Sequence, residues 1–359
     1  MCKPVPTEDD QVTLTLAAFF SQMAVYPSLI VILILVIAVT VVSGATDAPN
    51  AIATAVSTRC LSPGVALAIA AVFNFVGLIG MTYISAAVAH TMFNMVDFSG
   101  ETGTALVCLE AAMVASILWG IGCWFLGIPA SKSHSLIAGI TGGAVALNGW
   151  GGIVWGEWAK VIYGMVFSLV AGFILGWLFV KAIEVIFRKA DRRRANKVCT
   201  IIQDICACML AFLHGAQDGQ KFMSIAMLGI MLSFGMDDLS DVGFPLWLMI
   251  LVSTAISLGT LIGGKRIIKS VAMDMVKLEK YQGVVANLST SFMLLVASLT
   301  GMPVSTSHCS TSSIMGVGAA KNPKNVKWNI AGNMVLAWVI TFPLCGLLGF
   351  GMTKLFMLF

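Results

Sequence analysis

Charged residues are scarce in this chain. Asp, Glu, Lys and Arg make up 11% of its 359 residues, whereas soluble domains average about 25%. So few charges could not cover the surface of a water-soluble fold of this size. The mean hydropathy of +0.93 indicates the same environment. The composition therefore excludes an ordinary soluble domain and favours a protein that resides in the lipid bilayer.

Several patterns that would indicate a cofactor or a secreted protein are also missing. The nine cysteines form no C-x-x-C pair and show no metal-ligand spacing, so we expect neither a disulfide framework nor a zinc site. The first residues, MCKPVPTEDDQ, are polar and partly acidic, which is not typical of a signal peptide. The sequence has no nucleotide-binding P-loop, and ATP-driven action by this chain alone is not expected. We expect no resident cofactor.

Long apolar runs dominate what is present. The run at 28–43, SLIVILILVIAVTVVS, does not alternate between apolar and polar residues, as the strands of a membrane barrel would. Because only helices or closed barrels satisfy the backbone inside a bilayer, the predicted fold class is an all-α polytopic membrane protein. Segments near or above the ~20 residues that a crossing helix needs lie at 28–44, 64–89, 104–127, 161–187, 198–214, 244–263, 284–300 and 328–357.

Three shorter apolar pieces lie between these segments. Leu136–Leu147 and Ser313–Ala320 are rich in small residues, chiefly Gly and Ala. Each follows a proline, Pro129 or Pro303, so we predict that they form re-entrant hairpins or half-helices. The sequence does not indicate how deep in the membrane the third piece, Phe222–Phe234, lies.

Positive charges gather in three loops. Arg188–Lys197, Lys265–Lys280 and Lys321–Lys327 hold six, five and three Lys or Arg residues, or 14 of the chain's 21. Each cluster adjoins an apolar segment, so the positive-inside rule places all three in the cytoplasm, and a nucleic-acid-binding patch is the weaker interpretation. We expect a multi-pass plasma-membrane protein that contacts lipid and no nucleic acid.

The two halves of the chain repeat each other. GATD at 44–47 reappears as GAQD at 215–218, and PASKSH at 129–134 reappears as PVSTSH at 303–308. The shared order and near-equal spacing indicate an internal duplication, and duplicated, interrupted apolar segments are typical of secondary transporters. The predicted division is an N-terminal segment (1–27), a first transmembrane repeat (28–187), a basic cytoplasmic loop (188–197) and a second transmembrane repeat (198–359).

Two acidic residues, Asp47 and Asp218, hold equivalent positions at the ends of apolar runs. A carboxylate at membrane depth is costly and usually lines a cavity or an ion path; an interfacial helix cap is the alternative. Neighbouring hydroxyls and amides complete an all-oxygen shell, which suits a hard cation such as Na⁺, while protonation would serve H⁺ coupling. The candidate cation ligands are Asp47, Thr46, Asn50, Asp218, Gln217 and Gln220.

The second motif pair combines a proline with hydroxyl groups. Proline stops a helix, and the S-x-S-H that follows presents hydroxyls and free N–H groups at the start of a new one. Two such N-termini facing each other could hold one tetrahedral oxyanion; the alternative is that the hydroxyls only cap or pack membrane helices. The candidate anion donors are Ser131, Ser133, Ser305, Thr306 and Ser307.

Three more residues of these motifs could support the anion site. His134 and His308 could donate to the anion, relay a proton or hydrogen-bond the backbone, and the structural role is favoured for each. Lys132 occurs only in the first copy. It would add a positive charge if it points inward, or its long stem could extend to the membrane interface.

These motifs resemble the duplicated signatures of the inorganic phosphate transporter (PiT) family. GATDAPNAIATAVSTR and HGAQDGQK, paired with IPASKSHSLIAG and MPVSTSHCSTSSIMG, are similar to its G-A-N-D-x-x-N, H-G-x-N-D-x-Q and P-x-S-T-T-H motifs over most of the chain. The resemblance implies phosphate import with Na⁺ or H⁺, an inverted-repeat fold and a homodimer. It assigns the family's carboxylates to Asp47 and Asp218, its amides to Asn50 and Gln220, and its anion-binding hydroxyls to the five donors named above.

The sequence departs from the family pattern at three kinds of position. Thr46 and Gln217 stand in place of Asn, which still supplies oxygens but leaves the cation open. Lys132 replaces Thr and could displace a cation from the first half-site, which would change the coupling stoichiometry. Ser133 and Ser307 replace Thr conservatively.

The resulting hypothesis is a cation-coupled phosphate transporter, not an enzyme, that works by alternating access. Cations at the aspartates would neutralise carboxylates that otherwise repel phosphate. Two alternatives stay open. Hydroxyls and N–H groups contact only the oxygens of a tetrahedral anion and do not distinguish its central atom, so sulfate or another tetrahedral oxyanion could be the substrate. Ser131 with His134, or Ser305 with His308, could also indicate an intramembrane hydrolase, although a duplicated site suits an anion better than one asymmetric catalytic centre.

Overall fold

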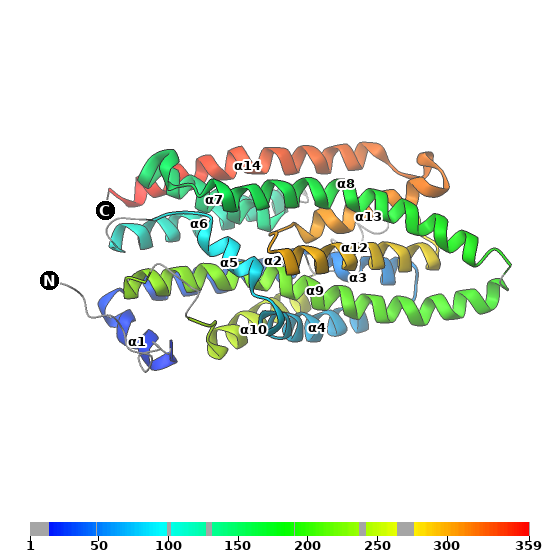
Figure 1. The fold of residues 1–359 in the computed structure, drawn as a ribbon, viewed down its shortest axis with the longest axis horizontal. Helices are drawn as coiled ribbons and strands as arrows, with labels where there is room; N and C mark the ends of the chain where they lie inside the picture. Colours follow the sequence, from blue (N-terminus) through cyan, green and yellow to red (C-terminus); the bar gives the residue numbers. More distant parts are fainter. Residues whose placement is uncertain are drawn as a thin grey trace.

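The computed structural model describes residues 14–47, 49–98, 102–126, 131–189, 191–236, 242–263 and 276–358. Within these ranges the chain is helical apart from loops and one isolated bridge between Val96 and Ile153. The long helices lie side by side along the long axis of the molecule (Figure 1). In chain order the elements are α1 (Leu16–Val25), α2 (Ser28–Asp47), α3 (Pro49–Ser57), α4 (Pro63–Ile84), α5 (Ala87–Asn94), α6 (Thr102–Leu126), α7 (Lys132–Asn148), η1 (Gly149–Gly152), α8 (Trp155–Ile186), α9 (Arg192–Phe234), α10 (Leu246–Ile262), α12 (Lys280–Thr300), α13 (Thr306–Lys321), η3 (Pro323–Asn325) and α14 (Trp328–Phe356).

Seven helical stretches among the described residues are long and apolar enough to cross a membrane. Their outer surfaces carry large exposed apolar side chains, such as Val170 and Ile174 on α8 and Val339 and Leu347 on α14. Exposed apolar surface on this scale is rare in soluble monomers, whereas lipid is a suitable environment for it. The predicted fold class, an all-α polytopic membrane protein, is confirmed.

The course of α9 differs from the prediction. The segments expected at 198–214 and 222–234 form one continuous helix of 43 residues that passes through the GAQD motif. Gly215 lies within this helix without interrupting it. A Cβ at this position would lie 2.2 Å from the carbonyl oxygen of Asn74 on α4, so the glycine is needed for close packing of the two helices. The prediction of a separate short piece at 222–234 is therefore wrong. Asp218 lies within a helix, whereas Asp47 is the last residue of α2.

Two other predicted segments have different bounds. The segment expected at 64–89 is divided at Ser85, where α4 ends and α5 follows. The segment at 244–263 corresponds to α10, which has 17 residues and is shorter than the seven candidate spans.

The half-helices predicted after the two prolines are present as α7 and α13. They begin directly after Ser131 and Ser305, several residues earlier than the apolar pieces suggested. Each packs against the helix that precedes it, α6 or α12, and the two extend from the middle of the molecule toward opposite ends (Figure 1). Pro129 lies outside the described residues, while Pro303 is buried just before α13.

Glycines hold both half-helices against long helices. A Cβ on Gly142 of α7 would lie 2.0 Å from the carbonyl oxygen of Gly346 on α14. Likewise, a Cβ on Gly316 of α13 would lie 2.1 Å from the carbonyl oxygen of Phe173 on α8. Backbones in direct contact leave little room for sliding, so these contacts fix where the N-termini of α7 and α13 point.

Two of the three basic clusters lie at the same end of the molecule (Figure 1). Arg188–Lys197 connects α8 to α9, and Lys321–Lys327 connects α13 to α14. Most of Lys265–Lys280 lies outside the described residues. Charge gathered at one end is the pattern that the positive-inside rule describes.

Candidate functional site

A buried polar centre lies where the end of α2, the middle of α9 and the N-termini of α7 and α13 meet. Asp47 and Asp218 are 6% and 1% exposed. A buried carboxylate is costly unless charges or hydrogen bonds compensate it. The partners of these two side chains therefore define the chemistry of the site.

Asp218 has four polar partners. The Nζ of Lys221 lies 3.0 Å from its Oδ1, and the hydroxyl of Ser133 donates to the same oxygen over 3.4 Å. The hydroxyl of Thr306 donates to Oδ2 over 3.3 Å, and Nε2 of His214 lies 3.3 Å from that oxygen. Both carboxylate oxygens are thus occupied by protein donors from α7, α9 and α13.

Asp47 has a simpler set of partners. The hydroxyl of Ser307 donates to its Oδ1 over 3.2 Å, and the hydroxyl of Ser43, one helical turn earlier, donates to Oδ2 over 3.4 Å. The amide nitrogen of Asn50 donates to the Ser307 hydroxyl oxygen over 2.8 Å. The result is a donor chain that runs from Asn50 through Ser307 to the carboxylate.

The same chain exists at the second aspartate. Lys221 stands three residues after Asp218, as Asn50 does after Asp47, and its Nζ donates to the Ser133 hydroxyl oxygen over 2.9 Å. In both chains the serine comes from a half-helix in the other half of the chain: Ser133 reaches Asp218, and Ser307 reaches Asp47. The two half-sites are therefore linked crosswise.

The other predicted hydroxyls cap the half-helices. Ser131 accepts a hydrogen bond from the backbone N–H of His134 over 3.3 Å, and Ser305 accepts one from the N–H of His308 over the same distance. Both are N-cap residues of the kind that start helices. This geometry uses the backbone of each histidine rather than its ring, so neither serine is arranged as a nucleophile with a histidine base.

The two histidine rings lie against each other. The centroids of His134 and His308 are 4.2 Å apart in an edge-to-face arrangement, with Phe342 beside His134 and Trp338 beside His308. Nδ1 of His134 and both ring nitrogens of His308 are buried without a hydrogen-bond partner. The rings thus belong to an aromatic contact between α7, α13 and α14.

Three predicted cation ligands donate hydrogen bonds to groups other than the carboxylates. Thr46 donates to the carbonyl of Val42 over 2.9 Å, a common helix interaction of threonine. The amide of Gln217 donates to Ser298, and that of Gln220 donates to the carbonyl of Ser85, each over 2.9 Å. Their assignment as cation ligands stays a prediction. No group of three or more His, Cys, Asp or Glu side chains that could hold a metal occurs in the described part of the chain.

Lys132 is buried and does not extend to the membrane interface. Its side chain is 4% exposed, and its stem lies against Gly120 of α6, where an added Cβ would be 3.4 Å from Cε. Of the two orientations considered, the structure has the inward one.

Sequence reasoning missed Lys221. This side chain is fully buried and also donates to the carbonyl of Val304 over 2.5 Å. A signal for it exists, because aligning the GATD motif with the GAQD motif places Lys221 opposite Asn50. Matching the family's amide to the neighbouring Gln220 hides this equivalence.

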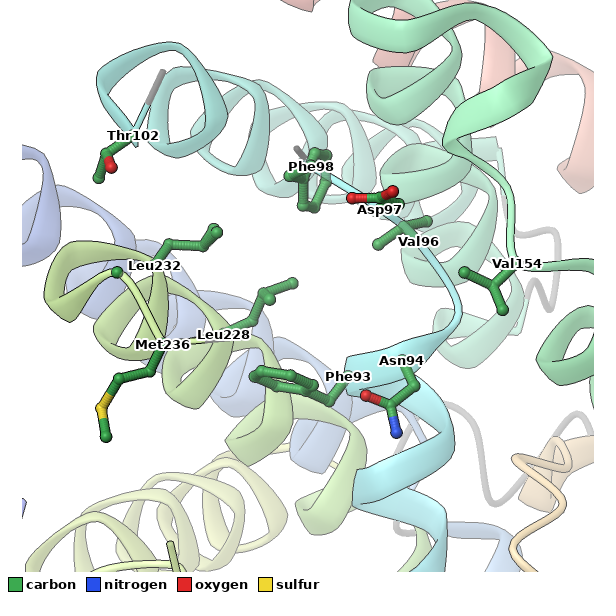
Figure 2. A pocket seen from close by; sticks show the side chains of 11 residues that line it. Phe93, Asn94, Val96, Asp97, Phe98, Thr102, Val154, Leu228, Leu232 and Met236 are labelled. Carbon is green, nitrogen blue, oxygen red and sulfur yellow. The ribbon is translucent and has the colours of Figure 1, made fainter. Parts of the chain in front are cut away.

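A pocket of about 660 Å³ is the second feature of interest (Figure 2). It is formed by the end of α5, the segment after it, the start of α6 and the C-terminal end of α9. Phe93, Phe98 and Leu228 give it an apolar wall, while Asn94 and Asp97 add polar groups. None of the buried residues that contact Asp47 or Asp218 lines this pocket.

A membrane bundle with paired half-helices and two buried carboxylates at their N-termini defines a helical membrane transporter. Comparison with known proteins gives the family. Residues 43–349 match the sequence profile of the phosphate transporter family, and the chain belongs to that family. The family predicted from the duplicated motifs is confirmed, and the chain is a transporter rather than a hydrolase.

Relatives align over almost the whole chain. A probable low-affinity inorganic phosphate transporter of Bacillus subtilis is 35% identical over 320 residues, which cover 89% of this chain and 94% of that protein. One of Rhizobium meliloti is 36% identical and covers 85% and 90%. A solved structure of a protein named as the sodium-dependent phosphate transporter has a TM-score of 0.84 at 21% identity, covering 92% of this chain and 99% of that one. This similarity shows that the two chains share a fold.

Proposed function

We propose that this protein imports inorganic phosphate together with a monovalent cation, by alternating access across the plasma membrane. Family membership and the names of the relatives support phosphate as the substrate. The solved structure of similar fold belongs to a transporter named as sodium-dependent, which favours Na⁺ as the coupling ion. The two crosswise donor chains that end on Asp47 and Asp218 are the observation that carries the mechanism.

These chains supply a physical link between cation and anion. A serine hydroxyl has one proton to donate, and Ser133 and Ser307 give theirs to the carboxylates. A cation bound to the carboxylates competes for the same oxygen lone pairs. Each hydroxyl can then turn and donate to phosphate, while Asn50 or Lys221 continues to hold its oxygen. Cation binding thereby prepares the anion site.

The N-termini of α7 and α13 complete the anion site in this proposal. Free backbone N–H groups and the positive end of each helix dipole attract an oxyanion. The two half-helices extend toward opposite ends of the bundle (Figure 1), which supports an inverted repeat with phosphate between them. In this proposal the buried aspartates belong to a closed state, and transport requires opening to each side in turn. A homodimer stays a prediction from the family resemblance.

The first test measures radiolabelled phosphate uptake into proteoliposomes, with an imposed Na⁺ gradient, an imposed proton gradient or neither. We expect uptake driven by the Na⁺ gradient and inhibited by unlabelled phosphate. Inhibition by sulfate at equal concentration would instead favour the broader oxyanion alternative. Intact vesicles that take up no phosphate under any gradient would refute the proposal.

Matched variants test the role of the carboxylates. Asp47→Asn and Asp218→Asn each remove a cation ligand's charge, and we expect uptake to fall at least about tenfold, which corresponds to about 1.4 kcal/mol. Asp191→Asn is the control, because Asp191 caps α9 in the exposed basic turn and asparagine caps helices equally well. Normal uptake by correctly folded Asp47→Asn and Asp218→Asn proteins would contradict the mechanism.

A further inference from the structure

The ammonium group of Lys221 lies among three oxygen atoms. Its Nζ is 3.0 Å from Oδ1 of Asp218, 2.9 Å from the hydroxyl oxygen of Ser133 and 2.5 Å from the backbone carbonyl oxygen of Val304. A lysine ammonium has three hydrogens to donate and no acceptor, so these contacts use all of its donors. The side chain of Lys221 is fully buried. Oxygen atoms of the protein therefore surround this positive charge in place of water.

The three oxygens are of the kinds that hard cations prefer. Carboxylate, hydroxyl and backbone carbonyl oxygens together make an oxygen-only shell, and here they come from α9, from α7 and from the residues just before α13. Asp218, Ser133 and Val304 are all buried, and their oxygens converge on one point, as the ligands of a bound ion do. Lys221 thus fills a position that has the ligand chemistry of a monovalent-cation site.

The equivalent position in the first half of the chain is neutral. Asn50, three residues after Asp47, is the counterpart of Lys221, and its amide nitrogen donates to the Ser307 hydroxyl oxygen over 2.8 Å. The donors that the described residues supply to the Asp47 oxygens are the hydroxyls of Ser307 and Ser43. Within the described part of the chain, no Lys, Arg or His nitrogen lies within 4 Å of these oxygens. Asp47 therefore lacks the contacting cation that Asp218 has.

We infer that the ammonium group of Lys221 takes the place of a free monovalent cation at Asp218, so that free Na⁺ binds at Asp47 and not at Asp218. A sodium ion at Asp218 would have to share its ligands with the ammonium group, and repulsion between like charges in a buried site opposes this. At Asp47 a carboxylate and a serine hydroxyl have only a neutral amide beside them. The inference rests on the proposed cation coupling and specifies its stoichiometry: one Na⁺ at the two carboxylates instead of two.

Direct counting of bound Na⁺ tests the inference without transport. The purified protein in detergent is titrated with ²²Na⁺, and the number of ions bound per chain at saturation is compared between the wild type and Lys221→Asn. Asparagine reproduces the residue at the equivalent position of the first half. We expect one ion per chain in the wild type and two in the variant. Lys181→Asn, on the half-exposed surface of α8, is the matched control and should bind the wild-type number.

Variants of Asp47 assign the bound ions to the two half-sites. Asp47→Asn removes the charge of the first half-site, so we expect this variant to bind no Na⁺. The double variant Asp47→Asn with Lys221→Asn should bind one ion, at Asp218. A wild type that binds no ion or two ions would overturn the inference, and so would a folded Lys221→Asn protein that binds no more Na⁺ than the wild type.

Thermal stability gives a second measurement that needs less stable protein. Without its ammonium partner the buried Asp218 carboxylate destabilises the fold, and an ion that binds only the folded protein stabilises it. Replacing choline chloride with NaCl at constant ionic strength should therefore raise the melting temperature of Lys221→Asn by several degrees more than that of the wild type. Equal shifts in the two proteins would contradict a cation position at Asp218.

The ion counts and the transport assay can fail separately. A wild type that takes up no phosphate into intact vesicles under any gradient refutes the proposed function, while its ion counts still decide whether Lys221 occupies a cation position. Conversely, an unchanged ion count in Lys221→Asn overturns the inference even where Na⁺-driven uptake of phosphate is observed.

Discussion

Replacing Lys221 with methionine removes one buried charge and three donors while keeping most of the side-chain volume. In the variant, Asp218 would remain 1% exposed without its ammonium partner. Breaking a buried ion pair from one side costs about 3–5 kcal/mol. Since 1 kcal/mol lowers the melting temperature of a large chain by about 2 °C, we expect Lys221→Met to melt about 6–10 °C lower than the wild type in detergent.

Two comparisons make this result specific. Lys181→Met removes a half-exposed lysine whose Nζ lies 3.7 Å from Glu184, and an exposed pair of this kind contributes about 0–1 kcal/mol. The double variant Lys221→Met with Asp218→Asn leaves no unpaired charge, so it should recover part of the lost stability. The reasoning is refuted if Lys221→Met and Lys181→Met melt at the same temperature, measured by thermal unfolding of the purified proteins.

Two other substitutions probe the donor chain and the close packing of the half-helices. Ser307→Ala removes the hydroxyl that donates to the carboxylate of Asp47, and we expect phosphate uptake to fall several-fold. Ser257→Ala, which removes a hydroxyl from α10, should leave uptake unchanged. Equal rates of uptake in these two variants would contradict the coupling argument. Gly316→Ala places a methyl group 2.1 Å from the carbonyl oxygen of Phe173. Overpacking of this kind costs about 1–3 kcal/mol, so the melting temperature of the variant should drop by several degrees. Gly332→Ala, whose added methyl group meets no atom within 4 Å, should melt like the wild type.

The sequence was sufficient to predict the membrane fold and the half-helices, because each depends on local composition or on short motifs, while the duplication stays a prediction from the repeated motifs. The continuity of α9 was not predictable in this way. An apolar run interrupted by GAQDGQ is compatible with two short segments or with one helix. Its glycines serve contact with α4, as the 2.2 Å approach at Gly215 indicates, and a contact between distant segments leaves no local signal.

The contacts within the site show the same limit. Sequence reasoning placed Asp47, Asp218 and the hydroxyls together, but it could not find that Ser133 pairs with Asp218 and Ser307 with Asp47, since each pair joins the two halves of the chain. From the sequence alone, Thr46 is as good a candidate cation ligand as the residues beside it. In a helix, however, a threonine hydroxyl commonly bonds to the carbonyl four residues earlier, as Thr46 does with Val42.

The unbroken course of α9 has a mechanical consequence. At about 1.5 Å per residue, its 43 residues make a rod about 64 Å long, roughly twice the thickness of the hydrocarbon layer. Asp218 lies near the middle of this helix and cannot move along the membrane normal unless the whole helix does. Asp47, at the end of α2, has no such restriction. In the proposed alternating access, the two copies of the motif therefore have unequal freedom: the depth of Asp218 can change only together with the whole of α9, whereas that of Asp47 can change with the end of α2.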